Sequence, residues 1–121
     1  MTNQAVAQSC GDFETQWEIN DCAGQLFKRS DAELNRLYHE IKARLADDSD
    51  SLGLLVEAQR GWIVFRDAEC AFSANGVKTG SVYQFIHAMC LDQLTQARIA
   101  QLKYYLSCEE GDMSCPVPWA N

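Results

Sequence analysis

Apolar side chains recur at spacings of three and four residues along most of the chain, which is the period of an amphipathic α-helix. The clearest stripe begins after Ser30 and ends before the polar segment 47–51. Its members are Leu34, Leu37, Tyr38, Ile41 and Leu45. No segment alternates between apolar and polar positions for long enough to predict a β-strand. The pattern therefore predicts an all-α fold.

Three capping boxes divide this pattern into helices. In each box a Ser or Thr precedes a Glu or Gln by three residues, which is typical of a helix N-terminus. The boxes begin at Thr15, Ser30 and Ser81. A glycine-containing segment, 75–80, separates the last two expected helices. We therefore expect a compact bundle of about four helices, spanning about residues 15–27, 30–46, 52–74 and 81–106.

One face of the third expected helix mixes large apolar side chains with polar ones. Its members are Leu55, Gln59, Trp62, Ile63, Arg66 and Cys70. A buried guanidinium or amide must find partners or lose its hydration without compensation. Arg66 and Asp67 point about 100° apart on a helix and are expected to pair poorly. A carboxylate of an earlier helix, Asp21 or Asp31, is the expected partner of Arg66.

Two interpretations of this polar row remain open. In the first, Gln59, Trp62 and Arg66 belong to a satisfied polar network that fixes the register of the helices. Asn20 and Asn35 lie on or beside the apolar stripes of the first two helices and are candidates for the same network. In the second interpretation, the row binds a ligand.

Six cysteines are a high and even number for 121 residues: Cys10, Cys22, Cys70, Cys90, Cys108 and Cys115. They predict three disulfides and an oxidising compartment. A zinc site is the alternative, but the C-x-x-C and H-x-x-x-H spacings that usually mark one do not occur. Six cysteines allow fifteen connectivities. We expect pairing in sequential order, because a helix that starts near Thr15 lets Cys10 fold back to Cys22, and the other two pairs each close a short connection.

Residues 1–9 are small and polar, and we expect a disordered tail ahead of a single domain, 10–121. The tail lacks the apolar core of a signal peptide. Ala5-Val6-Ala7 nevertheless has the small-x-small form of a cleavage site. We therefore expect a mature periplasmic or secreted protein whose leader has been removed and replaced by Met1.

The charge balance narrows the classes of partner. A net charge of −7 argues against nucleic acid and is compatible with a cationic protein partner. No apolar run approaches the length of a membrane span. The acidic loop, defined as residues 47–50 with Asp47, Asp48 and Asp50, is a candidate docking element. The alternative is a solvated loop that maintains solubility.

No pattern in the chain predicts catalysis, a cofactor or a metal. Each cysteine has a candidate disulfide partner, so none is expected to act as a nucleophile. His39 and His87 stand alone, and the carboxylates of Asp67 and Glu69 face different directions on a helix. The chain also lacks a phosphate-binding glycine loop.

Four motifs follow one another in order between residues 10 and 105. They are Thr15-Gln16-x-Glu18-x-Asn20-x-Cys22-Ala23, Asp31-x-Glu33-Leu34-Asn35-x-x-Tyr38, Gln59-Arg60-x-Trp62-x-x-Phe65-Arg66-Asp67-Ala68-Glu69-Cys70 and Leu94-Thr95-x-x-Arg98-x-x-x-Leu102. The series resembles the LprI-like lysozyme-inhibitor family of small secreted or periplasmic bacterial helical proteins. Ile19 stands where methionine is expected, and the Cys108–Cys115 tail lies outside the shared pattern. The shared motif residues assigned to a structural network are Asn20, Asn35, Tyr38, Gln59, Trp62, Arg66 and Asp67.

The resemblance implies a binding protein and not an enzyme. The first hypothesis is inhibition of a cationic lysozyme or a related peptidoglycan hydrolase. The alternative is an envelope interaction module, of the immunity or stress type, with an unidentified partner; an apolar groove in place of an acidic protrusion would favour it. A small-ligand pocket around Trp62 and Tyr38 is a third hypothesis, which filled packing there would exclude.

Overall fold

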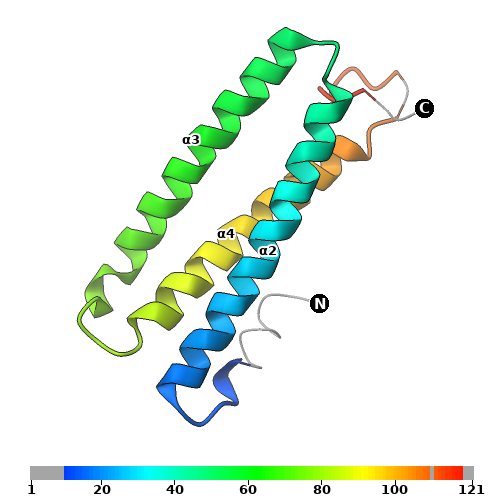
Figure 1. Cartoon of the computed structure of the whole chain (residues 1–121). Coiled ribbons are helices and arrows are strands. Elements are labelled where there is room, and N and C mark those ends of the chain that lie inside the picture. Colours follow the sequence, from blue (N-terminus) through cyan, green and yellow to red (C-terminus); the bar gives the residue numbers. More distant parts are fainter. Residues whose placement is uncertain (1–9, 110, 119–121) are drawn as a thin grey trace.

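The computed structural model describes residues 10–109 and 111–118, and three long α-helices run through them (Figure 1). These are α2 (Gln16–Arg44), α3 (Ser49–Ala74) and α4 (Tyr83–Leu106), with a short 3₁₀ helix, η1 (Asn75–Val77), before α4. The chain runs along the bundle through α2, back through α3 and forward again through α4. The predicted all-α class is confirmed. The expected tail, 1–9, and its Ala5-Val6-Ala7 site lie outside the described residues.

The expected number of helices is wrong, because the first two expected helices form one helix, α2. Ser30 does not begin a helix: it is buried in the middle of α2 and donates its hydroxyl hydrogen to Asp92 of α4. Glu33 accepts from Arg36 instead of capping a helix, and this donor holds the pKa of Glu33 below its usual value. The segment before Ser30 contains good helix formers and no proline, so nothing interrupts α2 there.

The other two capping boxes have different outcomes. Thr15 caps α2 as predicted, because its hydroxyl oxygen accepts from the backbone amide of Glu18 at 3.1 Å. Ser81 does not cap α4, which begins at Tyr83 without a side-chain cap. Of the three capping boxes in the sequence, only the one at Thr15 therefore forms a helix cap.

α2 and α4 are parallel neighbours whose side chains meet at a nearly constant sequence offset. Near one end, the side-chain amide of Asn20 donates to the carbonyl of Ser81, 61 residues later, at 3.0 Å. Near the other end, Arg44 donates to the carbonyl of Leu106, 62 residues later, at 3.2 Å. The buried serine–aspartate contact between them has the same offset of 62. The two helices therefore keep one register along their shared length.

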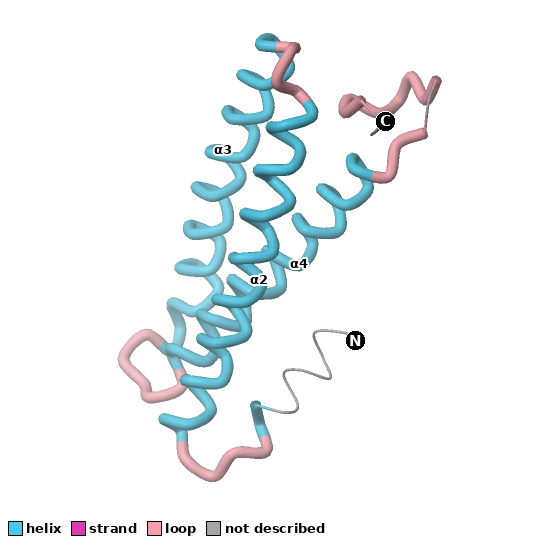
Figure 2. Tube along the Cα trace, turned by 45° about the vertical axis from the view of Figure 1, so that its right-hand side comes forward, coloured by secondary structure: helices cyan, strands magenta, loops and turns pink. Residues whose placement is uncertain are grey.

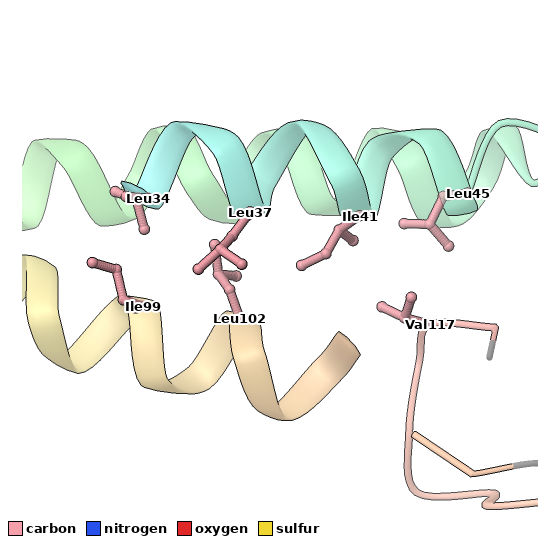
Figure 3. Packing of buried hydrophobic residues seen from close by; sticks show 7 residues of the cluster. All are labelled: Leu34, Leu37, Ile41, Leu45, Ile99, Leu102 and Val117. Atoms are coloured by element: carbon pink, nitrogen blue, oxygen red, sulfur yellow. The ribbon is translucent and has the colours of Figure 1, made fainter. Parts of the chain in front are cut away.

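The hydrophobic core lies between α2 and α4 and extends to the segment after α4 (Figure 3). The buried residues of this cluster are Leu34, Leu37, Ile41 and Leu45 of α2, Ile99 and Leu102 of α4, and Val117. The apolar stripe from Leu34 to Leu45 is thus the main core face of α2. Tyr38 and Trp62 pack against the same cluster as partly buried side chains, which argues against an open ligand pocket between them.

The cysteines pair in the predicted sequential order. The Cα atoms are 5.5 Å apart in Cys10–Cys22 and Cys70–Cys90, and 6.0 Å apart in Cys108–Cys115. The first pair ties the lead-in to α2, and the second joins the end of α3 to α4. The third closes the segment after α4, which lies at the same end of the bundle as the α2–α3 connection (Figure 2). Within the described residues, no helix is both long and apolar enough to cross a membrane.

Candidate functional site

Arg66 of α3 lies at the centre of a buried polar network and is only 8% exposed. Its guanidinium carbon lies 5.2 Å from the ring centre of Phe27 and 5.1 Å from that of Trp62. One ring comes from α2 and the other from α3. Contacts of this kind contribute about 0.5–2 kcal/mol each, with the larger values where water is excluded. The two rings therefore compensate part of the hydration that the guanidinium loses.

Carboxylates of α2 and α3 meet the charge of Arg66. Its Nη1 lies 3.5 Å from Oδ1 of Asp31, the partnership expected across helices. Its Nε donates to Oδ1 of Asp67 at 3.0 Å, so the expectation that these neighbours pair poorly is wrong. The long arginine side chain turns back toward the next position. Asp31 and Asp67 are 41% and 58% exposed, so solvent screens both ion pairs and each contributes little.

The network continues onto α4, which runs antiparallel to α3. Nη1 of Arg66 also donates to the hydroxyl of Thr95 at 3.5 Å. Nε of Arg98 donates to Oε1 of Gln59 at 3.0 Å. Thr95 and Gln59 are both buried. These bonds connect the inner face of α3 to α4 through polar groups.

A second part of the network joins α2 to α4. Asp92 is 2% exposed and accepts from the hydroxyl of Ser30. The side-chain amide of Gln96 donates to Oγ of Ser30 at 2.6 Å. Within the described residues, every buried side-chain nitrogen and oxygen has a hydrogen-bond partner. This saturation supports the structural interpretation, because it leaves no buried polar atom of the network without a protein partner.

The remaining motif residues lie apart from this network. Asn20 is near one end of the bundle, where it accepts from Gln16 at 2.8 Å and donates to the carbonyl of Ser81, two residues before α4. Asn35 is exposed on α2. Tyr38 lies at the edge of the core, with Nζ of Lys42 5.3 Å from its ring centre. Of the seven motif residues, the structure brings together Trp62, Arg66 and Asp67, while Gln59 of the same helix bonds to Arg98 of α4.

The acidic loop connects α2 to α3 at the end of the bundle opposite the start of α2 (Figure 1). Asp47, Asp48 and Asp50 are all exposed. Asp48 also caps α3, because its Oδ1 accepts from the backbone amide of Ser51 at 3.0 Å. This bond holds the pKa of Asp48 below its usual value. The amide of Asp48 in turn donates to the carbonyl of Leu45 at 2.9 Å, so the loop is a short hydrogen-bonded turn.

An apolar cavity of about 240 Å³ opens beside the acidic loop. Its walls come from the end of α2, the start of α3, the end of α4 and the segment after α4. They include Leu45, Leu54, Leu55, Tyr105 and Val117, with Arg98 as a basic side chain. This end of the bundle therefore combines exposed carboxylates with an adjoining apolar depression. Within residues 10–109 and 111–118, no cluster of His, Cys, Asp or Glu could hold a metal ion.

Both the network and the acidic loop fall within residues 7–102, which match the family described as lysozyme inhibitor LprI. The chain belongs to the LprI family. Uncharacterized protein R02472 of Rhizobium meliloti (strain 1021) is 31% identical over 119 residues, covering 89% of this chain and 86% of that protein. Uncharacterized protein YecT of Escherichia coli (strain K12) is 27% identical over 107 residues, covering 76% and 65%. No solved structure matches the chain.

Membership of the LprI family confirms the resemblance inferred from the four motifs. The family match ends at residue 102, so the Cys108–Cys115 segment lies beyond it, as expected. The buried Ser30 and Asp92, and the exposed Gln96 that bonds to Ser30, were not predicted as members of a polar network. A signal for Asp92 exists in the sequence, because Asp92 and Ile99 lie on the same helical face. A carboxylate on such an apolar stripe indicates a buried group with a partner on another helix.

Proposed function

We propose that this LprI-family protein is a periplasmic or secreted inhibitor of a lysozyme or a related peptidoglycan hydrolase. It acts by binding and not by catalysis. Family membership is the observation that carries the proposal, because the family is described as a lysozyme inhibitor. The net charge of −7 supports a cationic partner of this class.

The acidic end of the bundle is the surface we assign to the hydrolase. Asp47 and Asp50 are exposed there, and their carboxylates would face basic side chains at the rim of the enzyme's cleft. Electrostatic complementarity of this kind raises the association rate and weakens as salt is added. The adjoining apolar cavity of about 240 Å³ offers a place for an apolar side chain of the partner.

The acidic loop is ordered by its own hydrogen bonds, which reduces the entropy lost on binding. Asp48 contributes mainly to this order, since its carboxylate accepts from the amide of Ser51. Asp47 and Asp50 are therefore the side chains whose charges are free to meet a partner. A test of the proposal should change these two residues and leave Asp48 in place.

The experiment is muramidase activity against peptidoglycan with increasing amounts of the oxidised protein, at low and at physiological salt. Several lysozyme classes are included, and a heated, reduced sample serves as the inactive reference. We expect stoichiometric inhibition of at least one class. The double variant Asp47→Asn, Asp50→Asn should weaken inhibition about fivefold to tenfold at low salt, because each rim charge contributes a fraction of a kcal/mol to about 1 kcal/mol.

The matched control is the double variant Asp12→Asn, Asp21→Asn. It removes the same charge from exposed positions near the other end of the bundle. We expect its inhibition to equal that of the wild type within about twofold. Equal weakening by both variants would attribute binding to net charge and not to the loop. Failure to inhibit any class would overturn the proposed function.

An envelope interaction module with another partner is the second candidate. The cavity beside the acidic loop favours it, since an apolar depression accepts a side chain of many proteins and not of lysozymes alone. Specific capture of an envelope protein other than a hydrolase, abolished by filling the cavity with Ala58→Trp, would support this candidate. Inhibition of a lysozyme by the same surface would exclude it.

A further inference from the structure

The outward side of α3 is apolar and uncovered. Leu54, Phe65 and Phe72 are 59%, 54% and 77% exposed. Together with exposed small residues they form a row at alternating spacings of four and three, which we call the outer face of α3. Its members are Leu54, Ala58, Gly61, Phe65, Ala68 and Phe72. At one end of the row, Leu54 and Ala58 also form the rim of the cavity beside the acidic loop, whereas Gly61 to Phe72 lie outside it. Val64, 69% exposed, flanks the row, the exposed Glu57 and Glu69 lie on either side of it, and Asp50 precedes Leu54 on the same face.

The opposite side of α3 already makes the contacts that the bundle needs. Gln59, Arg66 and Cys70 face inward and bond to α4 or α2. An exposed row of large apolar side chains on a helix whose other side is already in contact with the bundle is typical of an interaction surface. A specific interface buries about 800 Å² on each partner, and exposed aromatic and aliphatic side chains along a helix of this length supply an area of that order. The outer face of α3 is thus large enough for a stable protein contact.

Gly61 has no function inside the bundle. It lies in the middle of α3, is exposed, and a Cβ added there would meet nothing within 4 Å. A glycine in a helix interior costs about 1 kcal/mol relative to alanine. Neither internal packing nor backbone geometry therefore explains a glycine at this position. Gly53 of the same helix is equally open, but only Gly61 lies on the apolar row, where the missing side chain leaves space for a bulky side chain of another molecule.

We propose that the outer face of α3 binds a second copy of this chain, with the two α3 helices antiparallel about a two-fold axis near residue 63. In this arrangement Phe65 of each copy packs over Gly61 of the other. Leu54 meets Phe72, and Ala58 meets Ala68. Large side chains therefore meet small ones at the centre, as in knobs-into-holes packing. The same surface serves on both copies, which is the requirement for a two-fold interface.

The charges favour the antiparallel arrangement over the parallel one. Parallel helices would place the two acidic loops side by side, and like charges at an interface are strongly unfavourable. Antiparallel helices separate the loops by the length of α3, about 40 Å, which exceeds the screening length of about 8 Å. They also bring the acidic N-terminal end of each α3 toward the end that carries the exposed Lys78 of the other copy.

The experiment measures the mass of the oxidised full chain by analytical ultracentrifugation from micromolar to submillimolar concentration. We expect a monomer–dimer equilibrium. Val64→Asp places two carboxylates face to face beside the axis and should raise the dimer dissociation constant about 100-fold. Gly61→Gln should do the same by filling the space that Phe65 of the other copy occupies. Neither variant changes a group that the monomer buries.

Gly53→Gln is the matched control, because Gly53 is also an exposed glycine of α3 with open space around it, but lies off the row. Both glycine variants should raise the melting temperature of the diluted monomer, since glutamine is the better helix former. Only Gly61→Gln should lose the dimer. A raised melting temperature together with a lost dimer would show that Gly61→Gln removes the interface and leaves the fold intact.

Two other results would overturn the proposal. A wild-type protein that stays monomeric at every concentration excludes a second copy as the partner. If Val64→Asp then abolishes lysozyme inhibition, the outer face belongs to the hydrolase instead. A dimer that survives both Val64→Asp and Gly61→Gln would show that another surface forms it. The proposal does not depend on inhibition, so either can fail without the other.

Discussion

Ser30 donates its hydroxyl hydrogen to the carboxyl group of Asp92, 62 residues further along the chain, in a site that excludes solvent from both. This contact links the middle of α2 to α4 and accounts for a serine in the middle of a long helix. A buried acceptor that loses its donor retains the full penalty of desolvation. The pair is therefore a sensitive point for the stability of the bundle.

Ser30→Ala should lower the free energy of unfolding by about 2–3 kcal/mol, because it leaves the buried Asp92 without this donor. Replacement of both groups in Ser30→Ala, Asp92→Leu should recover most of the loss, since no buried polar group is then left unpaired. Urea denaturation of the oxidised proteins measures both values. Ser73→Ala, at an exposed serine, should change stability by less than about 0.5 kcal/mol. A Ser30→Ala variant as stable as this control would contradict the prediction.

Arg66→Lys should destabilise the protein by about 2 kcal/mol, although the charge is kept. Lysine cannot reproduce the planar group that contacts the rings of Phe27 and Trp62. The two carboxylate partners contribute the smaller share, because both are half-exposed. Arg60→Lys, at an exposed arginine of the same helix, is the control and should be neutral within about 0.5 kcal/mol. The denaturation midpoints of the two variants should differ clearly, and equal midpoints would refute a central role for Arg66.

The cap formed by Asp48 should make stability depend on acid pH. The backbone amide of Ser51 holds the pKa of Asp48 below its ordinary value of 3.8. Because the pKa is lower in the folded state, the stabilisation is complete above 3.8 and is lost as the pH falls through the folded value. Asp48→Asn keeps an acceptor oxygen but does not titrate. Thermal melting from about pH 5 to about pH 2 should show the wild type losing more stability than Asp48→Asn. If the wild type and Asp48→Asn lose the same stability as the pH falls, the carboxylate of Asp48 does not contribute to the acid dependence.

Much of this fold could be predicted from the sequence, because apolar spacing reports directly which side of a helix faces the core. The stripe from Leu34 to Leu45 is buried as predicted. That Arg66 pairs with a carboxylate of an earlier helix followed from a physical requirement, since a buried guanidinium needs a partner. The sequence left Asp21 and Asp31 open, and the structure selects Asp31. The order of the disulfides followed from the start of α2 at Thr15 and from the short connections that the other pairs close.

The errors in the sequence-based prediction of helix starts arise where contacts with another helix decide between structures that the local sequence allows equally. The sequence around Ser30 has the local features of a helix start, yet its hydroxyl bonds to α4 and the helix continues. Ser81 has the same features and remains ahead of α4. The acidic loop remains a candidate docking element, and the cap that Asp48 forms on α3, by accepting from the backbone amide of Ser51, was not predicted from the sequence. A local pattern shows what a segment is able to form, and only the partner on another helix shows what it does form.

The Cys70–Cys90 bond lies at one end of α3. We therefore expect the two ends of this helix to differ in their protection against amide hydrogen exchange. The last turns of α3 are tied covalently to α4. The first turns adjoin the acidic loop and the cavity, and none of the three disulfides holds them. Amide hydrogen exchange near Ser51 should therefore proceed by local opening of these turns, whereas amides near Cys70 should exchange only when the whole bundle unfolds. The acidic end of the molecule is thus the region that can rearrange while the rest of the bundle stays folded.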